Sequence, residues 1–436
     1  MIKIFKYIFL VILLPAGFAA TAQTTSSSPY SKFGLGNIKG PILPQNRAMG
    51  GISTGIRRIG AYNNVNLQNP GSYSDIRMTT IDVGAFGGIT SLSNNTTKQG
   101  GVFNAALSHI VFGIPVSKNS ALSFGLVPYS DLGYNYTIPG KIDTNNVNYK
   151  YSGEGGLSQG YIGYGFSLGK HFSVGANASY IFGKLEESAT TDFDVSTTFT
   201  NSRTSRSRAI GGLSLEYGAQ YFTNPKPATR LIIGYSGTSG NKINSTATNL
   251  TTHFAKVFNQ DTGDQDELTA SDTTFFSEGA KSKLRLPSKN SLGFTLESAN
   301  KWLIGADVTA TNWSSYRDGA TNPGLNNSFT VNVGGQLTPD FTSVTNYLKL
   351  IDYRFGFKYD KTYINIKNTD IRDAAVTFGL GLPLPSNRGV SFYKINFATE
   401  LGQRGTLQNG LVRERYANFY IGITLNDQWF QKFKFD

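Results

Sequence analysis

The sequence predicts an all-β protein, a fourteen-stranded antiparallel transmembrane β-barrel with an N-terminal hatch, or plug, inside its lumen. Three observations support this fold class: long segments of alternating apolar and polar residues, a composition rich in Gly and aromatic residues, and a secretory signal. The 436 residues include 49 Gly, 23 Tyr and 30 Phe, but no Cys and only three His. Residues that favour strands and turns therefore dominate, and disulfide scaffolds and Cys-based metal sites are excluded.

The first 22 residues have the pattern of a secretory signal peptide. Lys3 and Lys6 precede a short apolar run, and small residues end in Ala20-Thr21-Ala22. The apolar run is too short to cross a hydrocarbon layer of about 30 Å, which disfavours the alternative of a membrane anchor. We therefore expect export, and a mature chain that begins near Gln23.

Residues 23–75 show no alternation and are predicted to form the hatch. They are rich in Gly, Ser and Asn and poor in apolar residues, so they would hardly fold alone. The alternative is a solvated tail. The hatch is favoured because its arginines could pair with carboxylates in the lumen. The expected partners are Arg47, Arg57 and Arg58 on one side, and Asp82, Glu216, Glu297 and Asp307 on the other.

Residues 76–436 are predicted to form the barrel. Near the C-terminus, apolar residues from Ala417 to Leu425 alternate with polar residues or Gly, and similar segments recur along the chain. Many of these segments run ten residues or more. That length fits transmembrane strands of about 9–11 residues, whereas ordinary strands have about five or six. The fourteen predicted strands are 76–90, 101–116, 119–139, 150–169, 171–187, 206–223, 229–246, 283–298, 301–316, 326–338, 347–361, 374–384, 389–404 and 411–427.

The connectors between these segments alternate between short and long. Bacterial outer-membrane barrels have short periplasmic turns and long external loops, so the connectors 188–205 and 247–282 are predicted to be external. The second contains Phe254, Phe258, Phe275 and Phe276, which could capture a hydrophobic compound. The alternative is a loop that packs over the barrel mouth. The connector around 339–346 is longer than a periplasmic turn usually is.

Three motifs, in order along the chain, resemble those of the FadL-type outer-membrane channels. The first is Asn69-Pro70-Gly71-Ser72, just before the first strand. The second runs from Leu286-Pro287 to Trp313-Ser314, and the third pairs Tyr353–Asp360 with Phe378–Pro383. The resemblance implies a hatch inside a fourteen-stranded barrel. It also implies passive transport of hydrophobic compounds, which leave sideways through a kink in the barrel wall.

The site residues predicted on this basis fall into two further groups. Gly34, Gly36, Arg47, Asn69 and Pro70 are candidates for the hatch and its gating. Asp307 and Arg354 are candidates for the lumen, with ion pairing between hatch and wall as the alternative role.

The sequence thus predicts a passive uptake channel for compounds such as long-chain fatty acids in the bacterial outer membrane. The alternative is a non-transporting accessory barrel of a machine for outer-membrane protein secretion or assembly, similar to type IX secretion. No catalytic or phosphate-binding motif occurs and the three His are far apart, so neither an enzyme nor a cofactor is expected. The expected partners are outer-membrane lipids and lipopolysaccharide, hydrophobic small molecules and other outer-membrane proteins, but no nucleic acid.

Overall fold

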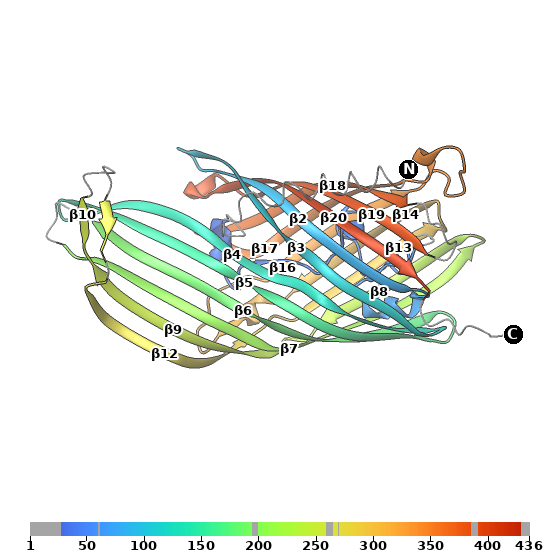
Figure 1. Cartoon of the computed structure of the whole chain (residues 1–436), viewed down its shortest axis with the longest axis horizontal. Helices are drawn as coiled ribbons and strands as arrows, with labels where there is room; N and C mark the ends of the chain where they lie inside the picture. Colours follow the sequence, from blue (N-terminus) through green and yellow to red (C-terminus); the bar gives the residue numbers. More distant parts are fainter. Residues whose placement is uncertain are drawn as a thin grey trace, which may run out of the picture.

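The computed structural model is a closed antiparallel β-barrel (Figure 1). It describes residues 28–59, 62–193, 199–258, 265–268, 270–384 and 391–428. Pairing of the last strand with the first, Asp427 with Thr79 and onward, closes the barrel. The predicted signal peptide at 1–22 lies outside the described residues. The boundaries 22 and 75 between signal, hatch and barrel stay predictions.

Fourteen strands form the wall, as predicted, and two of them are each broken into two pieces. The seventh consists of β8 and β9, and the eighth consists of β12 and β13. The second break falls at Leu286-Pro287-Ser288, where Pro287 has no N–H to donate to the ladder. The strands are β2 (Thr79–Ser93), β3 (Lys98–Ser117), β4 (Ser120–Ile142), β5 (Asn145–Leu168), β6 (Phe172–Phe193), β7 (Asn201–Lys226), β8 (Thr229–Thr238), β9 (Lys242–Phe254), β12 (Asp272–Arg285), β13 (Lys289–Ser298), β14 (Trp302–Thr311), β16 (Ser328–Leu337), β17 (Asp352–Ile366), β18 (Thr369–Leu384), β19 (Phe392–Gly405) and β20 (Arg413–Asp427).

The remaining elements are short. The two-residue strands β1 (Asn37–Ile38) and β15 (Arg317–Asp318) join the main sheet, and β10 (Lys256–Phe258) pairs with β11 (Gln265–Glu267). The helices are η2 (Pro29–Lys32), α2 (Pro44–Arg47), η3 (Pro70–Asp75), η4 (Trp313–Ser315), η5 (Tyr347–Lys349) and η6 (Gln408–Gly410). Among the described residues, no helix has both the length and the apolar character that a membrane-spanning helix requires.

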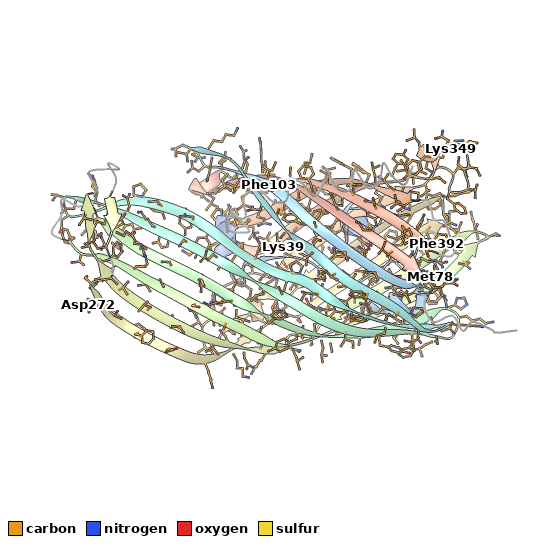
Figure 2. The ribbon with its side chains drawn as sticks, viewed as in Figure 1. Lys39, Met78, Phe103, Asp272, Lys349 and Phe392 are labelled. Atoms are coloured by element: carbon orange, nitrogen blue, oxygen red, sulfur yellow. The ribbon has the colours of Figure 1, made fainter. Side chains whose placement is uncertain are left out.

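The alternation in sequence separates the two faces of the wall. On β17 the side chains of Tyr353, Phe355 and Phe357 are exposed, whereas Asp352 and Arg354 are buried. Other outward aromatic side chains include Phe103 and Phe392, labelled in Figure 2. Aromatic and aliphatic residues thus cover the outside, and polar residues and Gly line the inside, as in a membrane barrel with a polar interior.

The wall is much taller on one side. Strands β4 to β7 have 22 to 26 residues, whereas β13, β14 and β16 have ten. Together with β9 and β12, the long strands form a curved sheet that projects beyond the barrel at the left of Figure 1. The segments 188–205 and 247–282 are therefore largely strand. Their prediction as loops was wrong. These strands were not predicted because they have no lipid-facing side, so their apolar and polar residues do not alternate regularly.

The described chain before β2, residues 28–59 and 62–78, lies inside the barrel (Figure 1). Most of its described residues are buried, and they form hydrogen bonds to strands all around the wall. We call residues 28–78 the N-terminal segment. At the tall end it contributes Tyr30 and Leu35 to a buried apolar cluster, which we call the roof cluster. Its other members come from inward-facing strand positions and from the loops around Trp313, Leu325 and Leu411.

Candidate functional site

A row of glycines lets the N-terminal segment lie directly on the barrel wall. One lumen-facing glycine occurs on each of nine successive strands, and a Cβ atom there would meet the segment. A Cβ on Gly165 would lie 2.2 Å from the Pro70 carbonyl oxygen, and one on Gly334 would lie 2.3 Å from that of Met49. We call these residues the glycine belt: Gly165, Gly175, Gly218, Gly234, Gly293, Gly305, Gly334, Gly356 and Gly379.

Asn69 and Pro70 are part of this close contact. Asn69 caps η3, since its Oδ1 accepts a hydrogen bond from the Gly71 N–H at 3.1 Å, and Pro70 follows as the first helical residue. The Asn69 amide also donates to the carbonyls of Thr54 at 2.7 Å and Ala219 at 3.2 Å. Both residues therefore connect parts of the N-terminal segment to each other and attach the segment to β7. The motif that suggested gating has, in this structure, an anchoring geometry.

The lumen carboxylates do not pair with the arginines as expected. Asp307 instead accepts hydrogen bonds at Oδ2 from the backbone N–H groups of Ser53 at 2.6 Å and Thr54 at 2.7 Å. It does join the segment to the wall, but through backbone donors. Arg354 contacts the wall alone, with Asp352 at 2.8 Å, Gln336 at 2.7 Å and Asn396 at 2.8 Å.

The arginines of the segment have other partners. Arg47 donates to the carbonyls of Ile42 and Gly40, both at 3.0 Å, and its guanidinium lies over the Tyr420 ring. Arg57 donates to Ser173 at 2.6 Å and lies 3.8 Å from Asp75. Burial lowers the pKa of Arg57 to about 10, against the opposing effect of Asp75. The prediction that these arginines pair with the lumen carboxylates was wrong. Backbone carbonyls and hydroxyls lie closer to the guanidinium groups, and the sequence cannot show where these acceptors lie.

The wall opens between β3 and β4. These strands pair only from Ile110 and Leu126 to their turn at Ser117 and Ser120. Towards the tall end, β3 pairs with β2 alone. Two local features explain the separation. Pro128 lacks an N–H, and the ladder of β2 and β3 shifts its register next to His109.

His109 turns inward at this register shift. Its ring fits because Gly84 opposite has no side chain; a Cβ there would lie 2.4 Å from the ring. The Nε2 atom lies 2.7 Å from Asp82 Oδ1, and both side chains are buried. The predicted strand 101–116 contains His109, but the sequence analysis did not predict its pairing with Asp82. The one sequence feature that could have indicated it is the glycine at position 84, opposite His109.

The N-terminal segment covers part of the free β4 edge. Strand β1 pairs Asn37 with Asp131 and Ile38 with Ser130. On either side of it, the Lys39 N–H donates to the Tyr129 carbonyl at 2.8 Å and the Ser28 N–H donates to that of Gly133 at 2.9 Å. Gly36 has φ +91°, and a Cβ there would lie 2.5 Å from the Asp131 carbonyl oxygen, so only Gly fits. Gly34, with φ +69°, lies in the turn just before β1.

A cavity of about 730 Å³ occupies the opening, and we call it the lateral cavity. Its apolar lining comes from both strands and from the segment, and charged side chains also line it. The volume lies within the range of small-molecule sites, about 300–1,000 Å³. The apolar lining includes Ile42, Leu43, Phe86, Ala106, Leu107, Leu126, Val127 and Leu157.

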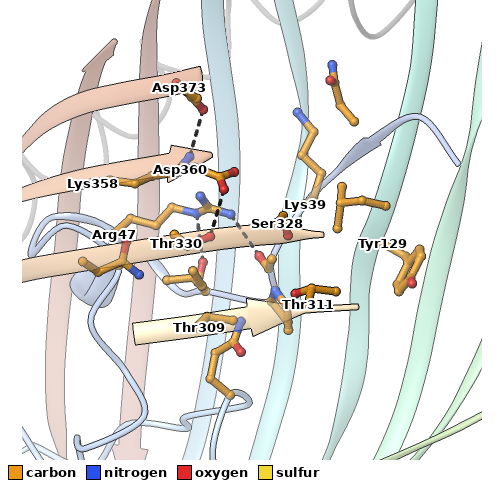
Figure 3. A pocket seen from close by; sticks show the side chains of 18 of the residues that line it. Lys39, Arg47, Tyr129, Thr309, Thr311, Ser328, Thr330, Lys358, Asp360 and Asp373 are labelled. Carbon is orange, nitrogen blue, oxygen red and sulfur yellow. Dashed lines mark hydrogen bonds and ion pairs between the residues drawn. The ribbon is translucent and has the colours of Figure 1, made fainter. Parts of the chain in front are cut away.

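A second cavity, of about 370 Å³, lies in the lumen, and its lining is mostly polar (Figure 3). In the wall, Lys358 pairs with Asp373 at 3.2 Å, and Thr330 donates to Asp360 at 3.0 Å. Both cavities touch Lys39 and Arg47 of the segment. Residues 39–42 and Arg47 therefore form the partition between the polar lumen and the apolar opening.

The four phenylalanines predicted to capture a ligand do not form one surface. Phe254 is buried under the Arg203 guanidinium at the end of β9. Phe275 and Phe276 are exposed, but they lie on β12 rather than in a loop. The side chain of Phe258 lies outside the described residues. In the described part of the chain, no group of three or more His, Cys, Asp or Glu is placed to hold a metal ion.

Solved structures with a similar fold include a toluene transporter, a hydrocarbon channel and a FadL homologue. The P. putida toluene transporter TodX has a TM-score of 0.57 at 14% identity, covering 91% of this chain and all of its own. The Pseudomonas aeruginosa FadL homologue has a TM-score of 0.55 at 14% identity, covering 90% of this chain and all of its own. The CymD monoaromatic hydrocarbon channel has a TM-score of 0.53 at 13% identity, covering 91% of this chain and 99% of its own.

At these identities the likeness establishes the fold, which is that of the FadL-type channels predicted from the motifs. No curated protein matches the sequence. One family model, BamG, matches residues 1–436. The chain therefore belongs to the BamG family and is a divergent FadL-like outer-membrane β-barrel.

Proposed function

We propose that this barrel is a passive uptake channel in which hydrophobic compounds such as long-chain fatty acids cross the wall sideways. The observation that carries the proposal is the opening between β3 and β4, filled by an apolar cavity of about 730 Å³. Transfer of a hydrophobic compound from water into such a cavity is favourable by roughly 0.8 kcal/mol per buried CH₂ group.

The direction of the route follows from the shape of the barrel. The tall end corresponds to the cell surface, because external connections are the long ones in bacterial barrels. A compound entering there would pass the partition at residues 39–42 and Arg47 and reach the lateral cavity. From the cavity it would enter the membrane directly, because β3 does not pair with β4 at this height.

Filling the lateral cavity tests this proposal. Ala106 lines the cavity, whereas its neighbour Ala105 on β3 is not among the lining residues. We expect Ala106→Trp to slow uptake of a labelled long-chain fatty acid by intact cells, and Ala105→Trp to leave the rate as in the wild type. The amount of folded barrel in the membrane is measured in parallel. Equal, wild-type rates for both variants would refute the lateral route.

A second function is favoured by a different observation. The roof cluster gathers 18 buried residues at the tall end, and beside it the tall sheet presents Phe275 and Phe276 to solvent. These two side chains are 54% and 59% exposed on β12, whose outer edge has no strand partner among described residues 272–282. Both features would suit a non-transporting accessory barrel that binds proteins at the cell surface in a secretion or assembly machine.

Purification in mild detergent separates the two functions. An accessory barrel would retain protein partners in fixed stoichiometry, and Phe275→Ser with Phe276→Ser would release them. Thr273→Ser with Thr274→Ser on the same strand serves as the control. A channel would retain hydrophobic compounds and no stoichiometric protein. Neither function requires an enzyme or a cofactor, in line with the expectation from the sequence.

A further inference from the structure

The long connector between β16 and β17 folds into a compact loop, which we call the rim loop (residues 339–350). Its two ends are joined by a hydrogen bond from the Asp340 N–H to the Lys349 carbonyl at 2.9 Å. Within it, Asn346 caps η5 by accepting from the Leu348 N–H at 3.0 Å. Asp340 accepts from the Thr342 N–H at 3.1 Å and the Thr342 hydroxyl at 2.7 Å. The loop is thus an ordered element at the end of the barrel where turns are short.

The rim loop lies on the outer side of the wall. Tyr353 is an outward residue of β17, and its hydroxyl donates to the Leu348 carbonyl at 3.0 Å. The Tyr347 hydroxyl donates to the carbonyl of Pro383, near the end of β18, at 2.9 Å. In Figures 1 and 2 the loop, marked by Lys349, projects sideways from the barrel rather than onward along its axis. Its projection therefore lies in the plane that lipid would occupy.

The rim loop exposes a group of large apolar side chains. Val344 is 97% exposed and Leu348 is 63% exposed, and Phe341 and Tyr347 are also largely exposed. Such a group of large apolar side chains is unfavourable in water and marks an interaction surface. It continues the lipid-facing surface of the barrel, because Leu337 at the end of β16 and Tyr353 at the start of β17 flank the loop and also face outward.

We propose that the rim loop is inserted into the periplasmic leaflet of the outer membrane, with phospholipid acyl chains as its partners. Val344 and Leu348 lie among the acyl chains, and Phe341 and Tyr347 lie at the level of the head groups. Lys349, exposed on the same loop, faces anionic head groups. The loop fixes the height and tilt of the barrel at the short-turn end. This role does not depend on whether the barrel transports anything.

The absence of Cys from the sequence allows a direct test with single labels. Val344→Cys and, as control, Lys118→Cys in the exposed turn between β3 and β4 each receive one nitroxide. The labelled barrels are reconstituted into vesicles of phosphatidylethanolamine and phosphatidylglycerol. We expect the label at 344 to collide with dissolved oxygen and to be shielded from a water-soluble nickel chelate. The label at 118 shows the reverse.

Two results would overturn the proposal. The first is a label at 344 that is as accessible to the nickel chelate as the label at 118. The second is a label at 344 that is shielded in native outer membranes but accessible in the pure lipid vesicles, which would assign the surface to a protein partner.

Discussion

Gly165 and Gly160 lie on the same strand, but their surroundings differ completely. A Cβ on Gly165 would lie 2.2 Å from the Pro70 carbonyl oxygen, whereas a Cβ on Gly160 would have no heavy atom within 4 Å. The same contrast holds around the belt, where the missing side chains make room for backbone. The N-terminal segment is therefore held by shape as well as by hydrogen bonds.

Gly165→Ala should consequently destabilise the barrel, and Gly160→Ala should not. A methyl group at 165 must displace the backbone at Pro70, an overpacking that typically costs about 1–3 kcal/mol. The urea midpoint of each variant in detergent, followed by gel mobility of the folded form, measures the difference. Equal midpoints would mean that the segment moves freely away from the wall.

Tyr30 gives the segment a dependence on alkaline pH. Its hydroxyl donates to the Val412 carbonyl, and burial, assisted by Glu414, raises its pKa from 10.0 to about 12. A group whose pKa is raised on folding contributes its full stability below the unfolded pKa. The contribution is then lost as the pH rises through the folded pKa. The window for Tyr30 is thus pH 10 to 12.

We therefore expect the wild-type barrel to lose stability more steeply than Tyr30→Phe between pH 10 and pH 12. The difference should be on the order of 3 kcal/mol at most, since each unit of pKa corresponds to about 1.4 kcal/mol. Urea midpoints at several pH values measure it. Parallel curves for the two proteins would show that Tyr30 ionises as easily in the folded state as in the unfolded one.

Among the elements, β1 has the most direct link to the proposed route. It occupies the β4 edge that β3 leaves free, and its pairing depends on the close approach of Gly36 to Asp131. Lys39 next to β1 forms an ion pair with Asp131 at 3.1 Å, and its ammonium lies over the Phe86 ring at the cavity. Displacing this short strand would widen the opening.

Gly36→Ala tests this role of β1. The new methyl group would push the strand from the β4 edge, so we expect faster uptake of a hydrophobic probe by cells. Gly410→Ala is the matched control, because Gly410 also has a positive φ but nothing within 4 Å of its Cβ position. If both variants take up the probe at the wild-type rate, the partition does not limit passage.

The strands also show how much of the fold could be predicted from the sequence. Alternation located all fourteen strands, because lipid on one side and polar groups on the other impose a period of two. It missed the outer ends of β6 and β7 and most of β9 and β12, where apolar and polar residues do not alternate. It also could not show the opening at β3 and β4, which depends on one register shift and one proline. The partners of Asp307 were missed because they are backbone N–H groups, and those of Arg354 because they depend on the register of β16, β17 and β19.

At the scale of the whole molecule, two ends of one barrel have different properties. The tall end holds the roof cluster and a curved sheet that projects beyond the barrel. The other end carries an apolar loop directed into the plane of the membrane. Between them, a fixed N-terminal segment occupies the lumen, and a large cavity with an apolar lining lies at the side of the wall. This arrangement favours movement of hydrophobic compounds through the wall.

The most direct measurement is photo-cross-linking of a long-chain fatty acid that carries a diazirine, performed in native outer membranes. The cross-linked residues are then mapped by mass spectrometry. The lateral route predicts cross-links inside the opening, at residues such as Ile42, Leu107 and Val127. Cross-links confined to the lipid-facing surface, with none on the N-terminal segment, would contradict it.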